Sequence, residues 1–199
     1  RLADGAHFHT MIVTSTLEAS VIEGDKLVIK SGIVRCDGDI RVSSISGSGD
    51  IEVGGDIICD EITFTGKLRC NGDIVCSGNL SVNGSLDTRH ISGQTVRLNG
   101  VLKGHDVNSR ALEVHPLRST MFSRFDMDGY EDGSTVRHIT AVTVEANHLQ
   151  CRTLTADSAM LRNGSAVESA TCATALGIDR TSSVLLVNGD CQRIHLKTA

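Results

Sequence analysis

Three consecutive rows of seventeen residues decide the fold: VRCDGDIRVSSISGSGD (34–50), IEVGGDIICDEITFTGK (51–67) and LRCNGDIVCSGNLSVNG (68–84). The columns agree when the rows are aligned, and each row carries a glycine followed by an aspartate. Self-similarity at a fixed period is the signature of a repeat architecture. The apolar columns are Val34, Ile51 and Leu68; Cys36, Val53 and Cys70; Ile40, Ile57 and Ile74; Val42, Cys59 and Cys76.

Within each row, apolar residues alternate with polar ones, which is the period of a β-strand. Glycine with Asp, Asn or Ser separates the segments, and these residues tolerate the positive φ of a corner. Each strand then pairs in parallel with its equivalent one row later. The sequence therefore predicts an all-β protein, a single-stranded parallel β-helix (β-solenoid) with three short strands per coil of about 17 residues. We expect a right-handed coil, because crossovers between parallel strands prefer that hand.

The same rhythm divides the chain. Residues 1–20 fit no column and are expected to be a flexible or capping leader, and residues 21–115 form an N-terminal stack. An irregular excursion at 116–135 holds the only proline and the only tyrosine. A C-terminal stack follows at 136–196, where Val144, Leu161 and Ile178 are spaced by seventeen, as are Val167 and Val184. Because the period is the same on both sides, we expect one continuous rod.

Composition fits a narrow coil. Of 199 residues, 40% are hydrophobic but only 3% are aromatic, and 20 are glycine. The formal net charge of −5 argues against a nucleic acid or an anionic membrane surface as a general partner. No apolar run approaches the roughly 18 residues of a membrane span, so membrane association is not indicated. Seven cysteines without a CxxC pair predict reduced thiols in the cytoplasm.

Several patterns invite a chemical interpretation. The column Asp39, Asp56 and Asp73 suggests a calcium roll, but such rolls use nine-residue repeats, and corner carboxylates bonded to backbone amides are the simpler hypothesis. The cysteines of the rows fall at apolar positions, where Cys acts as a small hydrophobe more often than as a zinc ligand. The eight histidines are scattered and are expected on the surface.

Catalytic motifs are missing from the sequence. It contains no GxSxG elbow, no phosphate-binding GxxxxGK[ST] loop and no HExxH pair. Hexapeptide-repeat acyltransferases are an alternative, although their coils hold eighteen residues, and a polysaccharide-active β-helix would need more aromatic residues. We therefore predict a protein that is not an enzyme, with no catalytic residues, cofactor or metal.

The segment CNGDIVCSGNLSVNGSL (70–86) resembles the bactofilins, a family of polymer-forming cytoskeletal β-helices. The resemblance covers residues 21–115 and, more loosely, 136–194, including VTVEANHLQCRTLTADSAMLRNGSAV (142–167). It implies a cytoplasmic, cytoskeletal scaffold that polymerises end to end without nucleotide and positions client proteins. The chain departs from the family in its excursion and in lacking a clear membrane-targeting segment.

Two sets of residues follow as candidate interaction sites. Uncapped solenoid ends expose backbone groups and an apolar layer, so self-association is expected at the first and last coils. A non-polymerising module that binds other proteins is the alternative, with the excursion as a docking loop or as a plug. The candidate assembly residues are Val21, Leu27, Ile29, Val187, Ile194 and Leu196, and the candidate loop residues are Met121, Phe122, Phe125, Met127 and Tyr130.

Overall fold

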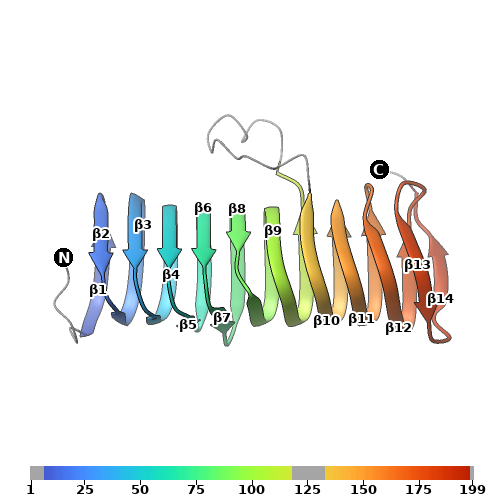
Figure 1. The fold of residues 1–199 in the computed structure, drawn as a ribbon, viewed down its shortest axis with the longest axis horizontal. Coiled ribbons are helices and arrows are strands. Elements are labelled where there is room, and N and C mark those ends of the chain that lie inside the picture. Colours follow the sequence, from blue (N-terminus) through green and yellow to red (C-terminus); the bar gives the residue numbers. More distant parts are fainter. Residues whose placement is uncertain (1–6, 118–132, 198–199) are drawn as a thin grey trace.

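Parallel β-strands stacked into one long coil make up the protein, and the computed structural model describes residues 7–117 and 133–197 (Figure 1). The strands form a single sheet that winds through about 10 turns, and no helix occurs within these two ranges. The β-solenoid predicted from the repeat is therefore confirmed. In chain order the strands are β1 (His7–Val13), β2 (Thr16–Ala19), β3 (Ile22–Cys36), β4 (Ile40–Val53), β5 (Ile57–Cys59), β6 (Glu61–Cys70), β7 (Asp73–Cys76), β8 (Asn79–Asp87), β9 (His90–His115), β10 (Ser134–Asn147), β11 (Leu149–Arg162), β12 (Ala166–Ile178), β13 (Ser183–Asn188) and β14 (Gln192–His195).

Residues one row apart lie above each other in the parallel register that the repeat predicts. Ile40 pairs with Ile57, and Ile57 pairs with Ile74. The columns that begin at Val34 and Cys36 also stack as expected. The three isoleucines are completely buried, so each coil adds one layer of branched aliphatic side chains to a continuous core.

A column of glycines lets the strands bend at one corner without interrupting the ladder. Gly49, Gly66, Gly84 and Gly100 are register partners on four successive coils, with φ between +134° and +146°. A Cβ at Gly66 would lie 1.9 Å from the carbonyl oxygen of Gly49. Because hydrogen bonding continues round this corner, a strand such as β3 runs for 15 residues, which differs from the three short strands expected per coil.

Apart from the coil that contains the excursion, the length of a coil varies between 15 and 18 residues along the rod. One expected column is wrong for this reason, because Val144 pairs with Ala159, fifteen residues on, instead of with Leu161. Leu161 does pair with Ile178, as its spacing predicts. The short coil turns at His148, whose backbone adopts the left-handed conformation with φ +54°.

The rod continues across the excursion. Lys103 in β9 pairs with Thr135 in β10, thirty-two residues further on, and the same register extends to Val114 opposite Ala146. The segment that separates β9 from β10 therefore leaves the stacking of the two halves in register. Regular structure resumes at Ser134, two residues before the predicted start of the C-terminal stack.

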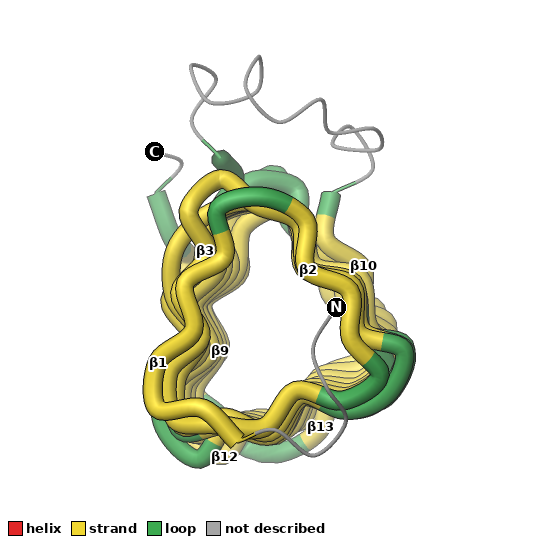
Figure 2. The backbone as a smooth tube through the Cα atoms, turned by 90° about the vertical axis from the view of Figure 1, so that its left-hand side faces the viewer, coloured by secondary structure: helices red, strands yellow, loops and turns green. Residues whose placement is uncertain are grey.

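From His7 onward, the expected leader is part of the solenoid. β1 and β2 both pair in parallel with β3, placing Met11 over Leu27 and Leu17 over Val34. For residues 7–19 the expectation that the chain fits no column is wrong, because the apolar residues there lie sixteen or seventeen positions before those of β3. A view along the rod shows β1 and β2 tracing the same three-sided outline as the coils behind them (Figure 2).

Candidate functional site

The N-terminal end of the rod is a row of apolar side chains from β1 and β2. Phe8, Met11 and Leu17 are half-buried and pack against the core, whereas Val13 and Ala19 are buried. In the described part of the chain, β1 and β2 pair with β3 alone, so strand pairing is present on one side of this row. Among the described residues, the row therefore presents both an apolar layer and a strand edge that pairs on one side.

The residues predicted for this end lie one coil further in. Leu27 and Ile29 are 0% and 1% exposed beneath β1, so they belong to the core and cannot form the terminal row. Val21 is 39% exposed at a corner of the second coil. The pattern Met11-x-Val13 lies sixteen residues before Leu27-x-Ile29. This match is the sequence signal that identifies β1 and β2 as the first coil of the described residues. It was missed because this coil lacks the Gly-Asp corner of the rows.

The C-terminal end is formed by β13 and β14, which both pair with β12. Val187, Ile194 and Leu196, predicted as assembly residues, are half-buried in this last coil. Leu185 and Leu186 project outward beside them and are 82% and 56% exposed. Val184 and Cys191 are half-buried there as well, so seven apolar side chains are incompletely covered at this end within the described residues.

At the Gly-Asp corner of the coils, the aspartates of the repeat link each coil to the next. The Oδ1 atom of Asp39 accepts a hydrogen bond of 2.9 Å from the backbone N–H of Asp56, and Asp56 accepts one of 2.9 Å from Asp73. The N–H of Asp56, together with the guanidinium of Arg41, holds the pKa of Asp39 below its usual range. The interpretation as corner carboxylates bonded to backbone amides is confirmed for Asp39 and Asp56, whereas the carboxylate of Asp73 contacts the ring of His90.

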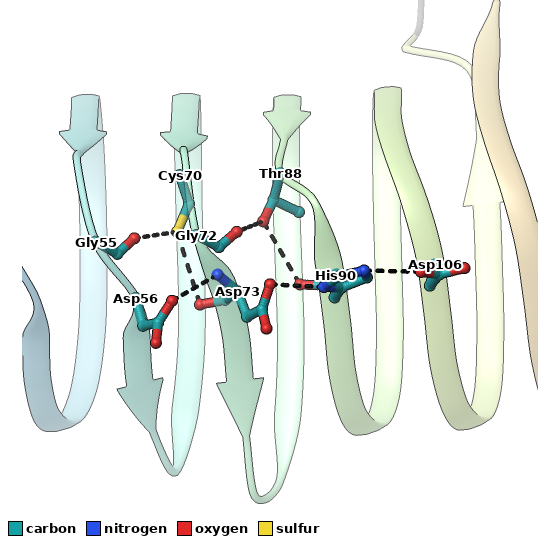
Figure 3. Close-up of polar contacts among 8 residues, drawn as sticks. All are labelled: Gly55, Asp56, Cys70, Gly72, Asp73, Thr88, His90 and Asp106. Carbon is teal, nitrogen blue, oxygen red and sulfur yellow. Dashed lines mark hydrogen bonds and ion pairs between the residues drawn. The ribbon is translucent and has the colours of Figure 1, made fainter.

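A histidine extends this column on the next coils (Figure 3). Nδ1 of His90 lies 2.7 Å from a carboxylate oxygen of Asp73, and Nε2 lies 2.8 Å from one of Asp106. Ionised carboxylates only accept hydrogen bonds, so both bonds form together only when the ring carries both protons. The three side chains are each more than 40% exposed, which places this contact on the solvated surface.

The cysteines serve the coil as buried thiols. Cys70 donates to the carbonyl of Gly55 at 3.2 Å (Figure 3), and Cys76 donates to that of Asp60 at 3.2 Å. Burial raises the pKa of Cys70 to about 11 and that of Cys151 to about 12, so both remain protonated at neutral pH. Cys59 pairs in register with Cys76, as the repeat predicts. All seven cysteines are free, and six are buried.

The acidic, histidine and cysteine side chains of the rod are dispersed over its coils. Within residues 7–117 and 133–197, no three His, Cys, Asp or Glu side chains come together in a way that could hold a metal ion. The carboxylates of the corner column are instead used in hydrogen bonds to backbone and to His90. The surfaces that stand out in the described chain are therefore the two ends and the outward columns of the rod.

The loop residues predicted as a dock or a plug, Met121, Phe122, Phe125, Met127 and Tyr130, lie outside the described residues. Their role stays a prediction.

Comparisons with known proteins give no match: no family model, no curated protein and no solved structure is similar to the chain. No helix in the described residues is long and apolar enough to cross a membrane.

Proposed function

We propose that the protein is a non-enzymatic structural protein whose rods assemble end to end into filaments. The apolar row at each end carries the proposal. A strand edge with neighbours on one side is a template for another strand, and repeat proteins remain separate when polar terminal repeats cover such ends. In the described residues, the two terminal coils carry half-buried apolar side chains instead: Phe8, Met11, Leu17, Val184, Val187, Cys191, Ile194 and Leu196.

The energetics of burying these rows suit reversible assembly. Full burial of an aliphatic side chain contributes roughly 1.5–3 kcal/mol, and about half remains to be gained for a half-buried one. Eight such side chains would contribute roughly 6–12 kcal/mol per junction, against roughly 4–15 kcal/mol for lost rigid-body freedom and side-chain ordering. Filaments should therefore form in a concentration-dependent equilibrium and need no hydrolysis to dissociate.

The similarity of the repeat to the bactofilins supports the same assignment. It extends the proposal to a cytoplasmic, cytoskeletal scaffold, along which client proteins bind to the outward columns. The regular spacing of coils, roughly 4.8 Å, would present any such binding column at constant intervals along a filament.

Sedimentation and negative-stain electron microscopy of the purified protein test the proposal. Ile194→Asp places a carboxylate in the C-terminal row and should shorten or abolish filaments while leaving the β-sheet circular dichroism signal intact. Ile58→Asp is the matched control, because Ile58 is 41% exposed on the side of the rod and should leave assembly unchanged. Leu27→Asp is unsuitable, since burial of a carboxylate at a fully buried position would unfold the coil.

A wild-type protein that sediments as a monomer at high concentration would contradict the proposal. Equal effects of Ile194→Asp and Ile58→Asp on filament length would contradict the assignment of the end rows. A monomer would favour the alternative of a non-polymerising binding module.

A further inference from the structure

One outward column on the side of the rod alternates strictly between acidic and basic residues. Register pairs join each member to the next, from β2 through β9. All of its side chains are exposed. We call it the charge column, and its members are Glu18, Arg35, Glu52, Arg69, Asp87 and Lys103.

Ion pairs within the chain leave the side chains of the charge column exposed to solvent. Arg35 lies 3.2 Å from Glu52, and Arg69 lies 3.8 Å from Asp87. These side chains are between 52% and 65% exposed, and ion pairs this exposed contribute little to stability. The same charges remain accessible to a partner.

The order of charges makes the column complementary to its own reverse. A two-fold axis between the coils of Glu52 and Arg69 would set Glu52 against Arg69 of a second copy, and each outer member against its opposite. Reversing an alternating series of six charges places an acid against a base at every position. An isologous contact needs this self-complementarity.

A second outward column obeys the same axis. Asp50 and Lys67 are register partners on the coils of Glu52 and Arg69, two residues earlier in the chain. The axis that pairs Glu52 with Arg69 therefore also pairs Asp50 with Lys67. The two columns flank a groove of about 380 Å³ on this face of the rod.

We propose that this face binds the same face of a second copy of the chain, so that two rods pair side by side and antiparallel. The charge column spans five coil spacings, or roughly 24 Å. A contact along so short a column buries much less area than the roughly 800 Å² per partner of a standard interface. The contact is therefore weak and electrostatic, and salt weakens it. It is distinct from end-to-end assembly, whose apolar junctions salt does not weaken in this way.

Beyond Lys103 the column continues with uncharged residues, Thr135, Gln150, Ala166 and Ser183. The overlap is thus confined to the N-terminal halves of the two rods. The C-terminal ends point away in opposite directions and stay free for assembly.

Charge inversion at the centre of the column tests the pairing. The background is Ile194→Asp, which places a carboxylate in the C-terminal row and so blocks head-to-tail assembly, and the assay is analytical ultracentrifugation at about 50 mM and about 500 mM salt. Glu52→Lys sets Lys against Arg69 twice in a pair of identical rods, and Arg69→Glu sets Glu against Glu52 twice. Each variant alone should weaken pairing by on the order of tenfold or more, and an equimolar mixture should restore it. The parent pair itself should dissociate at the higher salt.

Arg97→Glu is the matched control. Arg97 forms an ion pair with Glu113 at 2.8 Å on a different outward column, so its inversion should leave pairing unchanged. A parent that stays monomeric at low salt and millimolar concentration overturns the proposal. A mixture of Glu52→Lys and Arg69→Glu that pairs no better than either variant alone also overturns it. Each inversion disturbs contacts within its own chain to the same extent alone and in the mixture, so a recovery in the mixture can come only from the contact between chains.

Discussion

Replacing Gly66 by alanine should destabilise the rod far more than the same change at a glycine that lacks a close contact with the neighbouring coil. Gly66 has φ +134°, and its Cβ would lie 1.9 Å from the carbonyl oxygen of Gly49. A φ of +134° lies in a region populated almost only by glycine, and it costs a non-glycine residue about 1–3 kcal/mol. Relief of the overlap requires the ladder between two coils to open, at about 1 kcal/mol for each hydrogen bond lost. We expect Gly66→Ala to lower the free energy of unfolding by at least about 3 kcal/mol.

Two other glycines separate these contributions. Gly164 has φ +78°, but the nearest atom to its added Cβ would be 3.8 Å away, so Gly164→Ala should cost about 1 kcal/mol from backbone strain alone. Gly93 has no positive φ in the left-handed range and its nearest atom would be at 3.4 Å. Gly93→Ala should change stability by less than about 1 kcal/mol and in the stabilising direction, because alanine restricts the unfolded chain.

Urea unfolding followed by far-ultraviolet circular dichroism measures the series, since the protein has no tryptophan for fluorescence. The background should carry Ile194→Asp, so that assembly does not add to apparent stability. The predicted order of destabilisation is Gly66→Ala, then Gly164→Ala, then Gly93→Ala. Equal losses at Gly66 and Gly164 would refute the inference that stacked glycines are required by contact between coils.

Two further predictions concern the core and pH. Ile57→Asp buries a carboxylate at a position that is 0% exposed and should unfold the rod, whereas Ile58→Asp, at 41% exposed, should retain cooperative melting; comparable melting temperatures would show that the strand register is wrong. For Asp179, burial alone would raise the pKa, but hydrogen bonds from the N–H of Asn163 and from Ser182 bring it to about 2. Because this folded pKa lies below the unfolded value near 3.9, the carboxylate should contribute about 2 kcal/mol above pH 4, and the contribution should disappear as pH falls towards 2. The difference in unfolding free energy between wild type and Asp179→Asn should therefore close over that interval; a difference that stays constant would disprove the linkage.

The inward positions and the aspartate corners were predictable because each has a simple periodic cause. Burial requires an apolar side chain at Ile40, Ile57 and Ile74, and the linkage of coils favours a carboxylate at Asp56. These demands recur at every coil of equal length, so they appear in the sequence as columns.

The two failures arise where this periodicity changes. The coil from Ser134 to Leu149 has 15 residues, and a fixed spacing of seventeen therefore assigned the wrong partner to Val144. The first coil uses Met11 and Leu17 as inward residues without a Gly-Asp corner, so a search for the repeat motif passed over it. To place either of these two coils correctly, the strand register must be known. That register depends on corner conformations that the sequence does not encode at a constant interval.

The candidate site was predicted in part. The C-terminal row followed from the persistence of the rhythm to Ile194, but the contact of His90 with Asp73 and Asp106 did not, because consecutive coils there differ by one residue in length. The charge column was present in the sequence as Arg35, Glu52 and Arg69 at intervals of seventeen. It was overlooked because the columns that revealed the repeat were the apolar positions and the Gly-Asp corner.

The C-terminal half of the rod shows that folding does not require the charge column. The same outward positions there are occupied by the uncharged residues Thr135, Gln150, Ala166 and Ser183. Those coils nevertheless retain a full parallel register and a buried core. Exposed ion pairs add little to stability in either half. Within one chain, alternation avoids like charges directly opposite each other on adjacent coils and gains roughly 0.2–1 kcal/mol for each opposite pair. The same alternation is what an antiparallel second copy requires, because it sets an acid against a base at each of the six coils.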